Sequence, residues 1–272
     1  MAEPVISLRD VGVQFNRNRK RKRSIRDLLL KGYIGRESAG EFWPFRHVNL
    51  DIYGGEAIGV VGRNGAGKST LLSLIAGVLL PDEGTVTVRE GVAPLIAITG
   101  GFESELTARE NIQLVAGLHG MTNREIAAAF DEIVEFAEIG KFLDTPFKHF
   151  SSGMKVRLAF SVVSRLDEPI LLVDEVLAVG DKRFRKKCLA RIEELLAGGT
   201  TLFLVSHSEV QLRRYCRRGL YLADGELRAD GPIEDVLEQY ERDQETWVGR
   251  GIEEEPENYY DRDVDATEDD LI

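Results

Sequence analysis

One eight-residue segment restricts the fold of this chain more than any other part of its sequence. Residues 62–69 read Gly-Arg-Asn-Gly-Ala-Gly-Lys-Ser, which fits the pattern G-x-x-x-x-G-K-[ST]. A continuous apolar run at residues 57–61 precedes the segment, as expected for a buried parallel strand, and residues 69–78 have helical character. The pattern requires this context of a buried strand, a loop and a helix. The sequence therefore predicts an α/β core around the loop rather than a chance glycine-rich turn.

The residue types in this loop suit the binding of phosphate. Glycines let backbone N–H groups curl around phosphate oxygens without a clash from Cβ. Lys68 would place a positive charge on the β- and γ-phosphates, and the Ser69 hydroxyl would reach Mg²⁺. The helix that follows would direct its positive N-terminal end at the same anion. The predicted nucleotide-binding residues are Gly62, Arg63, Asn64, Gly65, Ala66, Gly67, Lys68, Ser69 and Thr70.

Two acids follow a second apolar run, at residues 170–173. A buried strand delivers its last residues to the carboxyl edge of the sheet, where ligands bind in open α/β folds. Asp174 is suited to hold Mg²⁺, usually through water. Glu175 is suited to orient or deprotonate the attacking water. The alternative interpretation is a pair of surface acids at the end of a strand.

Strand and helix patterns alternate along most of the chain. Strands are expected at residues 5–8, 11–15, 48–52, 57–61, 85–88, 94–98, 170–173, 201–205, 220–223 and 226–228. Helices are expected within residues 107–166, at 186–196 and from Pro232 to about Tyr240. Asp224-Gly225 is a strong hairpin signal. The alternation predicts an α/β core with helices on both faces of the sheet.

The overall composition narrows the classes of function. The net charge of −11 gives no support to non-specific nucleic-acid binding. No stretch approaches the ~20 apolar residues needed to cross a bilayer, so any membrane role would go through a partner. Residues 1–11 lack a basic region followed by an apolar stretch, which argues against secretion. Cys188 and Cys216 are therefore expected to be buried or idle thiols in a reducing compartment.

Charge is distributed unevenly along the chain. Residues 17–23 form a basic cluster within an expected insertion at about residues 16–42, and acids dominate residues 253–270. The insertion is either a solvated loop or a segment near the cytoplasmic membrane face, where anionic headgroups attract basic side chains by ~1 kcal/mol per residue. The tail, residues 246–272, has few apolar groups to bury, so we expect it to be largely disordered.

The order of the motifs resembles that in the nucleotide-binding subunit of ABC transporters. After the phosphate loop come Ser-Ser-Gly-Met at residues 151–154, Leu-Leu-Val-Asp-Glu at 171–175 and Ser-His at 206–207. The resemblance covers roughly residues 6–240, which leaves only the tail outside. It implies the further assignments that follow.

A fold and a working assembly are implied by this resemblance. The fold is a P-loop NTPase of the ABC ATPase type, with a mixed core sheet, an antiparallel β subdomain and a helical signature subdomain. The domain would cover residues 1–245, with the helical part at about 107–166. ATP and Mg²⁺ would be its ligands, and two copies of the chain would sandwich two ATP molecules. Separate membrane-spanning permease subunits would hold the pair at the cytoplasmic face of the cell membrane.

Residues 150–154 stand where the family has its signature, Leu-Ser-Gly-Gly-Gln. Ser151 and Gly153 match it, and in the family this site grips the γ-phosphate bound to the other subunit. A helix from Lys155 onward would add free N–H groups at its start. Seen alone, Ser151 would be interpreted as a cap on that helix.

The residues that differ from the signature resemble those found in one branch of the family. Ser152 and Met154, followed by Arg-Leu-Ala-Phe-Ser at residues 157–161, resemble the branch that exports polysaccharides such as O-antigen and teichoic acid. The run Val-Leu-Ala-Val-Gly-Asp at residues 176–181 indicates the same branch. Its last residue, Asp181, matches the intersubunit aspartate of the family.

Three further positions complete the comparison with the family. His207 matches the switch histidine that senses the γ-phosphate. Phe15 matches the aromatic residue that stacks on adenine, although aromatics at strand ends are commonly core residues. The glutamine that links ATP to the permease is not evident in residues 98–103, where Glu103 is a candidate substitute.

Three classes of function remain open at this point. The leading interpretation is ATP-driven export of a polysaccharide, with a lipid carrier, across the cytoplasmic membrane. Import or efflux of small molecules is the alternative, which the variant signature and the missing glutamine argue against. A soluble ABC ATPase of translation or DNA repair would need a second such domain or a long coiled coil, and the chain shows neither pattern. The tail is too short for a carbohydrate-binding domain.

Overall fold

The computed structural model describes residues 3–16, 41–95, 100–174 and 181–249. A central sheet in this part of the chain has the strand order β5-β6-β7-β3-β8-β9. Its strands are β3 (Ala57–Val61), β5 (Val92–Leu95), β6 (Ile170–Asp174), β7 (Thr201–Val205), β8 (Arg218–Ala223) and β9 (Glu226–Pro232). Neighbours are parallel except β8 and β9, which pair antiparallel. The predicted Asp224-Gly225 turn joins those two strands, and both turn residues have positive φ as such a turn requires.

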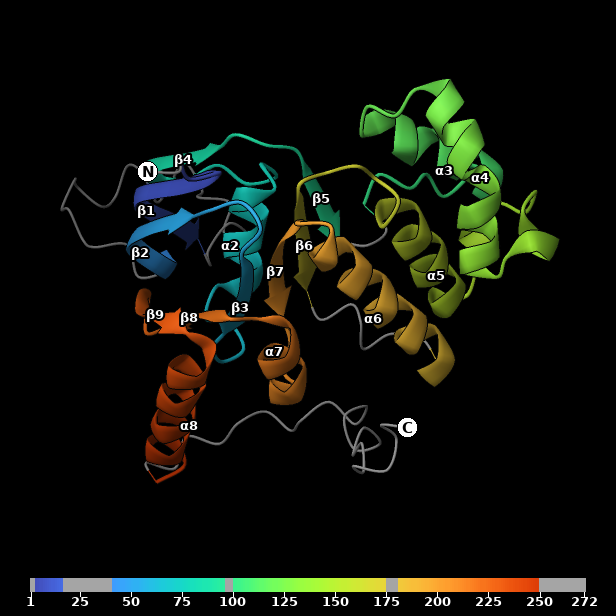
Figure 1. Cartoon of the computed structure of the whole chain (residues 1–272). Helices are drawn as coiled ribbons and strands as arrows, with labels where there is room; N and C mark the ends of the chain where they lie inside the picture. The colour runs from blue at the N-terminus through green and yellow to red at the C-terminus, as the bar shows by residue number, and fades with distance from the viewer. Residues whose placement is uncertain (1–2, 17–40, 96–99, 175–180, 250–272) are drawn as a thin grey trace, which may run out of the picture.

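A smaller antiparallel sheet packs beside the central one (Figure 1), with the strand order β2-β1-β4. Its strands are β1 (Ile6–Asn16), β2 (Glu41–Ile52) and β4 (Glu83–Val88). The two strands expected at residues 5–8 and 11–15 form one strand, because Asp10 at φ 51° makes a local irregularity rather than a break. The expected insertion lies largely outside the described residues.

Helices cover both faces of the central sheet, as the alternation predicted (Figure 1). The helix α2 (Lys68–Ile75) lies between the two sheets and shares a core with both. On the opposite face lie α6 (Lys182–Ala197), α7 (Glu209–Tyr215) and α8 (Ile233–Gly249), which share a second core. Because both faces are covered, β7 is buried at every residue.

Two expected helix boundaries differ from the observed ones. The helix α6 begins at Lys182 rather than residue 186, because Asp181 caps it. Pro232 ends β9 opposite Arg218 instead of opening the last helix. That helix, α8, continues past Tyr240 to Gly249, and the Tyr221 hydroxyl donates to an Asp243 carboxylate oxygen at 3.1 Å along this extension.

A group of helices beyond β5 has a core of its own (Figure 1). It contains α3 (Ala108–Leu118), α4 (Asn123–Ala137), α5 (Ser152–Val163) and the 3₁₀ turns η1 (Gly140–Phe142) and η2 (Phe147–His149). The helix α5 also reaches the main core through Phe160. It starts at Ser152 instead of Lys155, because the side chain of Ser151 caps its first turn. We refer to this group as the helical subdomain.

Both cysteines are buried in the described part of the chain, as predicted. Burial raises the pKa of the Cys188 thiol and of the Cys216 thiol to about 12. Both therefore stay protonated and poorly nucleophilic at neutral pH. Among the described helices, none combines the length and the apolarity that a membrane crossing requires.

A buried amide holds the entrance to the helical subdomain in place. The Asn111 side chain is fully buried and donates to the carbonyl oxygens of Glu103, Leu106 and Thr107 at 2.9, 3.1 and 3.0 Å. Its Oδ1 accepts from the backbone N–H of Glu103 at 2.7 Å. One side chain thus satisfies backbone groups along the loop that leads into α3.

Replacing Asn111 with alanine should leave several of these buried groups without partners. We expect Asn111→Ala to lower the free energy of unfolding by about 2–4 kcal/mol, since each orphaned buried group costs about 1–3 kcal/mol. Denaturant titration followed by circular dichroism measures the change. The exposed Gln113→Ala on the same helix is the control, and equal effects of the two substitutions would contradict the prediction.

Candidate functional site

The loop at residues 62–69 joins β3 to α2 and has a backbone that only glycine tolerates at two places. Gly62 has φ 150°, and a Cβ there would lie 2.4 Å from the carbonyl oxygen of Leu222. Gly67 has φ 98°, and its Cβ would lie 2.8 Å from the ring of Phe45. The neighbouring strands therefore leave no room for a Cβ atom at Gly62 or Gly67, and the positive φ values also favour glycine at both positions.

Lys68 is folded back under this curve and is only 8% exposed. Its Nζ donates to the carbonyl oxygens of Gly62 and Arg63 at 2.7 and 3.2 Å. It opens α2, whose N-cap residue is Gly67 and has no side-chain cap. The first backbone N–H groups of a helix lack intrahelical acceptors and carry partial positive charge. A buried ammonium beside an uncapped helix start fits a phosphate group, and the N–H groups of Ser69 and Thr70 lie at that start.

The carboxyl ends of the central strands bring Asp174 and His207 to the same edge of the sheet. Asp174 ends β6 and pairs in register with Val205 of β7, which pairs with Val60 of β3. After β7, the Ser206 hydroxyl donates to Gln211 at 3.0 Å and accepts from the Ser208 N–H at 3.0 Å. This turn presents His207 at the surface. Glu175 lies outside the described residues.

The donor set at this edge is compatible with Mg²⁺. The ion prefers oxygen ligands and keeps several waters, so it needs few protein groups. Ser69 offers a hydroxyl and Asp174 a carboxylate at the edge where the loop lies. Among the described residues, no cluster of three or more His, Cys, Asp or Glu side chains forms a metal cage. Phosphate oxygens and water would complete the coordination.

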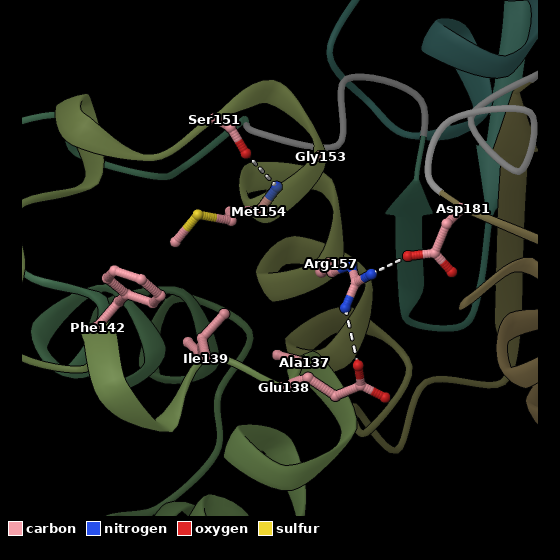
Figure 2. A pocket seen from close by; sticks show the side chains of 9 residues that line it. All are labelled: Ala137, Glu138, Ile139, Phe142, Ser151, Gly153, Met154, Arg157 and Asp181. Carbon is pink, nitrogen blue, oxygen red and sulfur yellow. Dashed lines mark hydrogen bonds and ion pairs between the residues drawn. The ribbon is translucent and has the colours of Figure 1, made fainter. Parts of the chain in front are cut away.

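Ser151 and Gly153 lie at the start of α5 and line a separate pocket of about 240 Å³ (Figure 2). The Ser151 Oγ accepts from the backbone N–H of Met154 at 3.2 Å, so it does cap the helix. Ser151 is nevertheless exposed, and a Cβ on Gly153 would meet nothing within 4 Å. In the described part of the chain, no hydrogen bond or ion pair joins either residue to residues 62–69.

Asp181 lines the same pocket (Figure 2). Its Oδ1 accepts from the backbone N–H of Phe184 at 2.9 Å, and its other oxygen pairs with Arg157. The N–H bond, and then the charge of Arg157, hold the pKa of Asp181 below its ordinary value. The structure thus brings Asp181 together with Ser151 and Gly153 in the lining of one pocket, which does not include residues 62–69.

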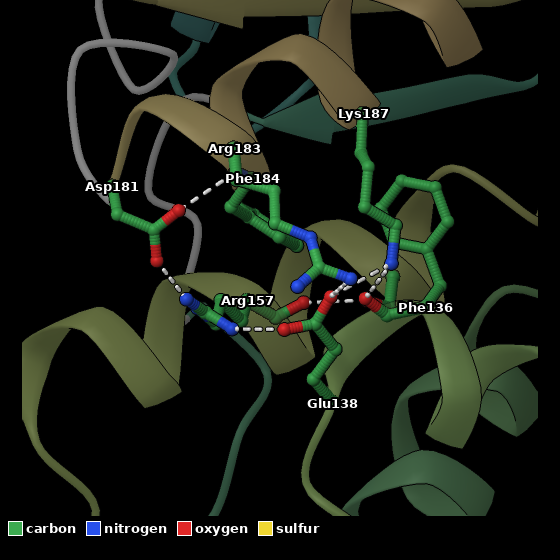
Figure 3. A network of polar contacts seen from close by, with 8 residues as sticks. Phe136, Glu138, Arg157, Asp181, Arg183, Phe184 and Lys187 are labelled. Atoms are coloured by element: carbon green, nitrogen blue, oxygen red, sulfur yellow. Dashed lines mark hydrogen bonds and ion pairs between the residues drawn. The ribbon is translucent and has the colours of Figure 1, made fainter.

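Arg157 and Glu138 also line this pocket, and no sequence motif assigns a role to either side chain. Arg157 Nη1 donates to Glu138 Oε2 at 2.9 Å (Figure 3). Partial burial acts to raise the pKa of Glu138, but hydrogen bonds from Lys187 and Arg157 outweigh it and lower the pKa. Glu138 is the C-cap residue of α4 and has φ 57°, a conformation that sequence patterns do not predict for glutamate.

Two further sequence assignments, Phe15 and Glu103, remain predictions. Phe15 lies near the end of β1 opposite Phe42 and is 42% exposed, so it is not a core residue. Its stacking on adenine stays a prediction. Glu103 is exposed, and its backbone is held by Asn111. The preceding residues 96–99 lie outside the described part, so its coupling role also stays a prediction.

Comparison with known proteins identifies the family. Residues 45–178 match the family model described as ABC transporter. The chain is 38% identical to the O-antigen export system ATP-binding protein RfbB of Klebsiella pneumoniae, over 88% of this chain and 98% of that protein. It is 40% identical to the teichoic acids export ATP-binding protein TagH of Bacillus anthracis over 83% of this chain, but it spans only 41% of that protein's length.

Solved structures share the fold of this chain. The chain superposes on an ATP-binding subunit of an ABC transporter with a TM-score of 0.69 and 23% identity, covering 90% of this chain and 98% of that one. A dimeric ATP-binding cassette in a post-hydrolysis state, bound to ADP and phosphate, gives a TM-score of 0.66 and 23% identity, covering 84% and 98%. The predicted fold class is confirmed, and the chain belongs to the ABC transporter family.

Proposed function

We propose that this chain is the ATP-binding and ATP-hydrolysing subunit of an ABC transporter that exports a lipid-linked polysaccharide. The phosphate loop carries the ATPase part of the proposal, because Lys68 is buried beneath it and α2 starts without a cap. The variant signature at residues 151–154 supports the export branch. So do the relatives, since O-antigen and teichoic acid are both polysaccharides and both relatives are named for exporting them.

ATP would bind with its phosphates in the loop at residues 62–69. Backbone N–H groups and Lys68 would hold the β- and γ-phosphates. Ser69 and Asp174 would hold Mg²⁺, which neutralises charge that develops on the phosphate oxygens during transfer. Glu175 would orient the attacking water or take its proton. The neutral imidazole of His207 could donate one hydrogen bond and accept another near the γ-phosphate.

A second copy of the chain would complete each ATP site. Ser151, Gly153 and Asp181 line one pocket. Within the described residues, none of the three is hydrogen-bonded to the phosphate loop of its own chain. Ser151 is exposed at the start of α5, where the first backbone N–H groups of the helix could meet the γ-phosphate held by a partner. Two copies facing each other would thus enclose two ATP molecules, each between one loop and the other copy's signature.

The pair would work at the cytoplasmic face of the cell membrane, through separate membrane-spanning permease subunits. The net charge of −11 favours this role over one on nucleic acid. ATP-driven closure of the pair would move the permease, and hydrolysis would reset it. The basic insertion at about residues 16–42 and the tail at 246–272 fall mainly outside the described residues.

Removing the buried ammonium tests the nucleotide site. We expect Lys68→Ala to weaken ATP binding by roughly 10- to 100-fold, since a hydrogen bond to a charged group contributes about 1.5–3 kcal/mol. Titration calorimetry with ATP measures the affinity. Lys141→Ala, an exposed lysine on η1, is the control. Equal affinity in the two variants would refute the assignment of Lys68.

A second prediction separates the two halves of the site. Glu175→Gln should lower turnover by ~1000-fold, a typical effect of removing a general base, and should leave an ATP-stabilised dimer visible by light scattering. Adding Ser151→Asp keeps a capping side chain but places a negative charge against the partner's γ-phosphate. The double variant should bind ATP as a monomer with unchanged affinity and fail to dimerise.

The matched control for that experiment is Ser151→Asn, which caps the helix without a charge. It should dimerise more readily than Ser151→Asp. A loss of monomer ATP affinity in Ser151→Asp would contradict the assignment of Ser151 to the partner's site. Equal dimer stability in Ser151→Asp and Ser151→Asn would also contradict this assignment.

Export is tested in the cells that contain the chain. Replacing the gene with the Lys68→Ala form should make lipid-linked polysaccharide accumulate at the cytoplasmic side and disappear from the surface. Extraction of lipid-linked sugars and staining of intact cells measure the two pools. Unchanged surface glycan, together with altered uptake or efflux of a small solute, would favour the alternative class of ABC transporter.

A further inference from the structure

One aromatic ring lies directly against the start of the helix that follows the phosphate loop. Phe45 of β2 is fully buried and shares a core with Leu71 and Leu72 of α2. A Cβ atom built on Gly67, the N-cap residue of α2, would lie 2.8 Å from Cδ1 of this ring and 3.0 Å from Cβ of Pro44. Phe45 and Pro44 therefore fill the space beside Gly67, so its backbone cannot move toward β2.

The other end of the loop lies against a different strand. A Cβ atom on Gly62 would clash with the carbonyl oxygen of Leu222 in β8. Between the two ends, Lys68 Nζ closes the curve by donating to the carbonyl oxygens of Gly62 and Arg63 at 2.7 and 3.2 Å. The loop is thus bordered by β8 at its first residue and by β2 at the residue that caps α2.

These two borders are bonded to each other. The backbone N–H of Arg46 donates to the carbonyl oxygen of Gly225 at 2.8 Å, and Phe45 forms a parallel bridge with the same glycine. Gly225 lies in the turn between β8 and β9, at the end of the strand that carries Leu222. Strand β2, the β8–β9 hairpin and the loop therefore form one closed frame, in which the loop cannot widen unless β2 moves.

The outer side of β2 is fixed as well. Arg46 donates two hydrogen bonds to the carboxylate of Glu83 in β4, from Nε at 2.6 Å and from Nη2 at 2.5 Å, and its guanidinium carbon lies 4.6 Å from the ring centroid of Trp43. A bidentate pair is directional, which limits the positions that the strand can adopt. Because Arg46 follows Phe45 in the chain, these contacts keep the ring of Phe45 against the loop.

We propose that Phe45 is a positioning residue for phosphate binding, which holds the backbone of Gly67 in the shape that receives the β- and γ-phosphates. A loop that is already ordered loses little conformational freedom when its ligand binds, and this raises the affinity. Without the ring, the N–H groups at the start of α2 would have to be ordered by the ligand itself. The inference rests on the proposed function, since it requires a phosphate ligand at this loop.

The same sheet carries the aromatic residue that is predicted to stack on adenine. Phe15 of β1 lies opposite Phe42 of β2, and Val13 lies opposite Phe45. Damage to the whole sheet would therefore weaken the contacts with the base and with the phosphates together, whereas a local role of Phe45 would affect the phosphates alone. Inorganic tripolyphosphate, which lacks the base, separates these two cases.

The test is titration calorimetry of the full-length chain with tripolyphosphate and with ATP, in the absence of Mg²⁺ so that no hydrolysis occurs. Phe45→Val should weaken the binding of both ligands by roughly 10-fold, the effect of losing one hydrogen bond to a charged group. The ratio of the two affinities should stay within about twofold of the wild-type ratio, because the base is bound elsewhere. Phe15→Ala should instead weaken ATP binding alone, by roughly 5- to 100-fold, the contribution of stacking on one base.

Phe203→Val is the matched control for the loss of a buried ring. Phe203 is also fully buried in the same core, but it lies on β7 in register with Ile58, near the start of β3, whereas the loop follows the end of β3. This variant should keep the wild-type affinity for tripolyphosphate even where its melting temperature falls as far as that of Phe45→Val. Phe45→Leu, which keeps part of the contact, should weaken tripolyphosphate binding by about two- to fivefold and provides the test if Phe45→Val does not fold.

Two results would overturn the role of Phe45. One is an affinity for tripolyphosphate in the Phe45 variants that equals that of Phe203→Val. The other is a loss confined to ATP, as in Phe15→Ala, which would mean that Phe45 supports the base-binding edge of the sheet instead of the loop. A wild-type chain that binds neither ligand, and does not differ from Lys68→Ala, would overturn the proposed function as well.

Discussion

The parallel pairing of β6, β7 and β3 is the constraint on which the rest of the site depends. Backbone hydrogen bonds align Asp174, Val205 and Val60 in one row across the sheet. Each of these strands continues into a segment that carries a polar group, so the row fixes the edge where those groups gather. A slip of one residue in any strand would turn its buried side chains to the other face and move its polar end away from the edge.

Much of this arrangement could be predicted from the sequence, because it follows from local patterns. The apolar runs at residues 57–61, 170–173 and 201–205 are all buried strands of the central sheet. Such runs need no alternation when helices cover both faces. The role of the glycines in the phosphate loop could also be predicted, since Gly62 and Gly67 adopt backbone conformations that other residues avoid. Chemistry that depends on neighbours in sequence is therefore visible before a structure is known.

The remainder depends on contacts between distant residues, which periodicity does not encode. The joining of two expected strands into β1 follows from the pairing of that strand with β2 and β4 across Asp10. The early start of α6 follows from the Asp181 cap, where the resemblance to the family had indicated only an intersubunit role. Arg157 belongs to a run of residues typical of one branch of the family, but its two carboxylate partners come from other elements. Glu138 caps the end of α4 with a left-handed backbone, at a position where glycine or asparagine is the usual residue.

The helix α5 contributes to two cores at once. Leu158 and Val162 pack in the helical subdomain, whereas Ala159, Phe160 and Val163 pack against the central sheet. The sequence of a helix with apolar neighbours on both sides has little freedom to vary, because a change in side-chain volume alters the packing of both cores. Substitutions at Phe160 would thus need compensating changes at Phe136 and at Phe184 together. In evolutionary terms, substitutions in the helical subdomain and in the central sheet would therefore occur together. If either part were exchanged between relatives, α5 would have to pack well against both the new part and the old one.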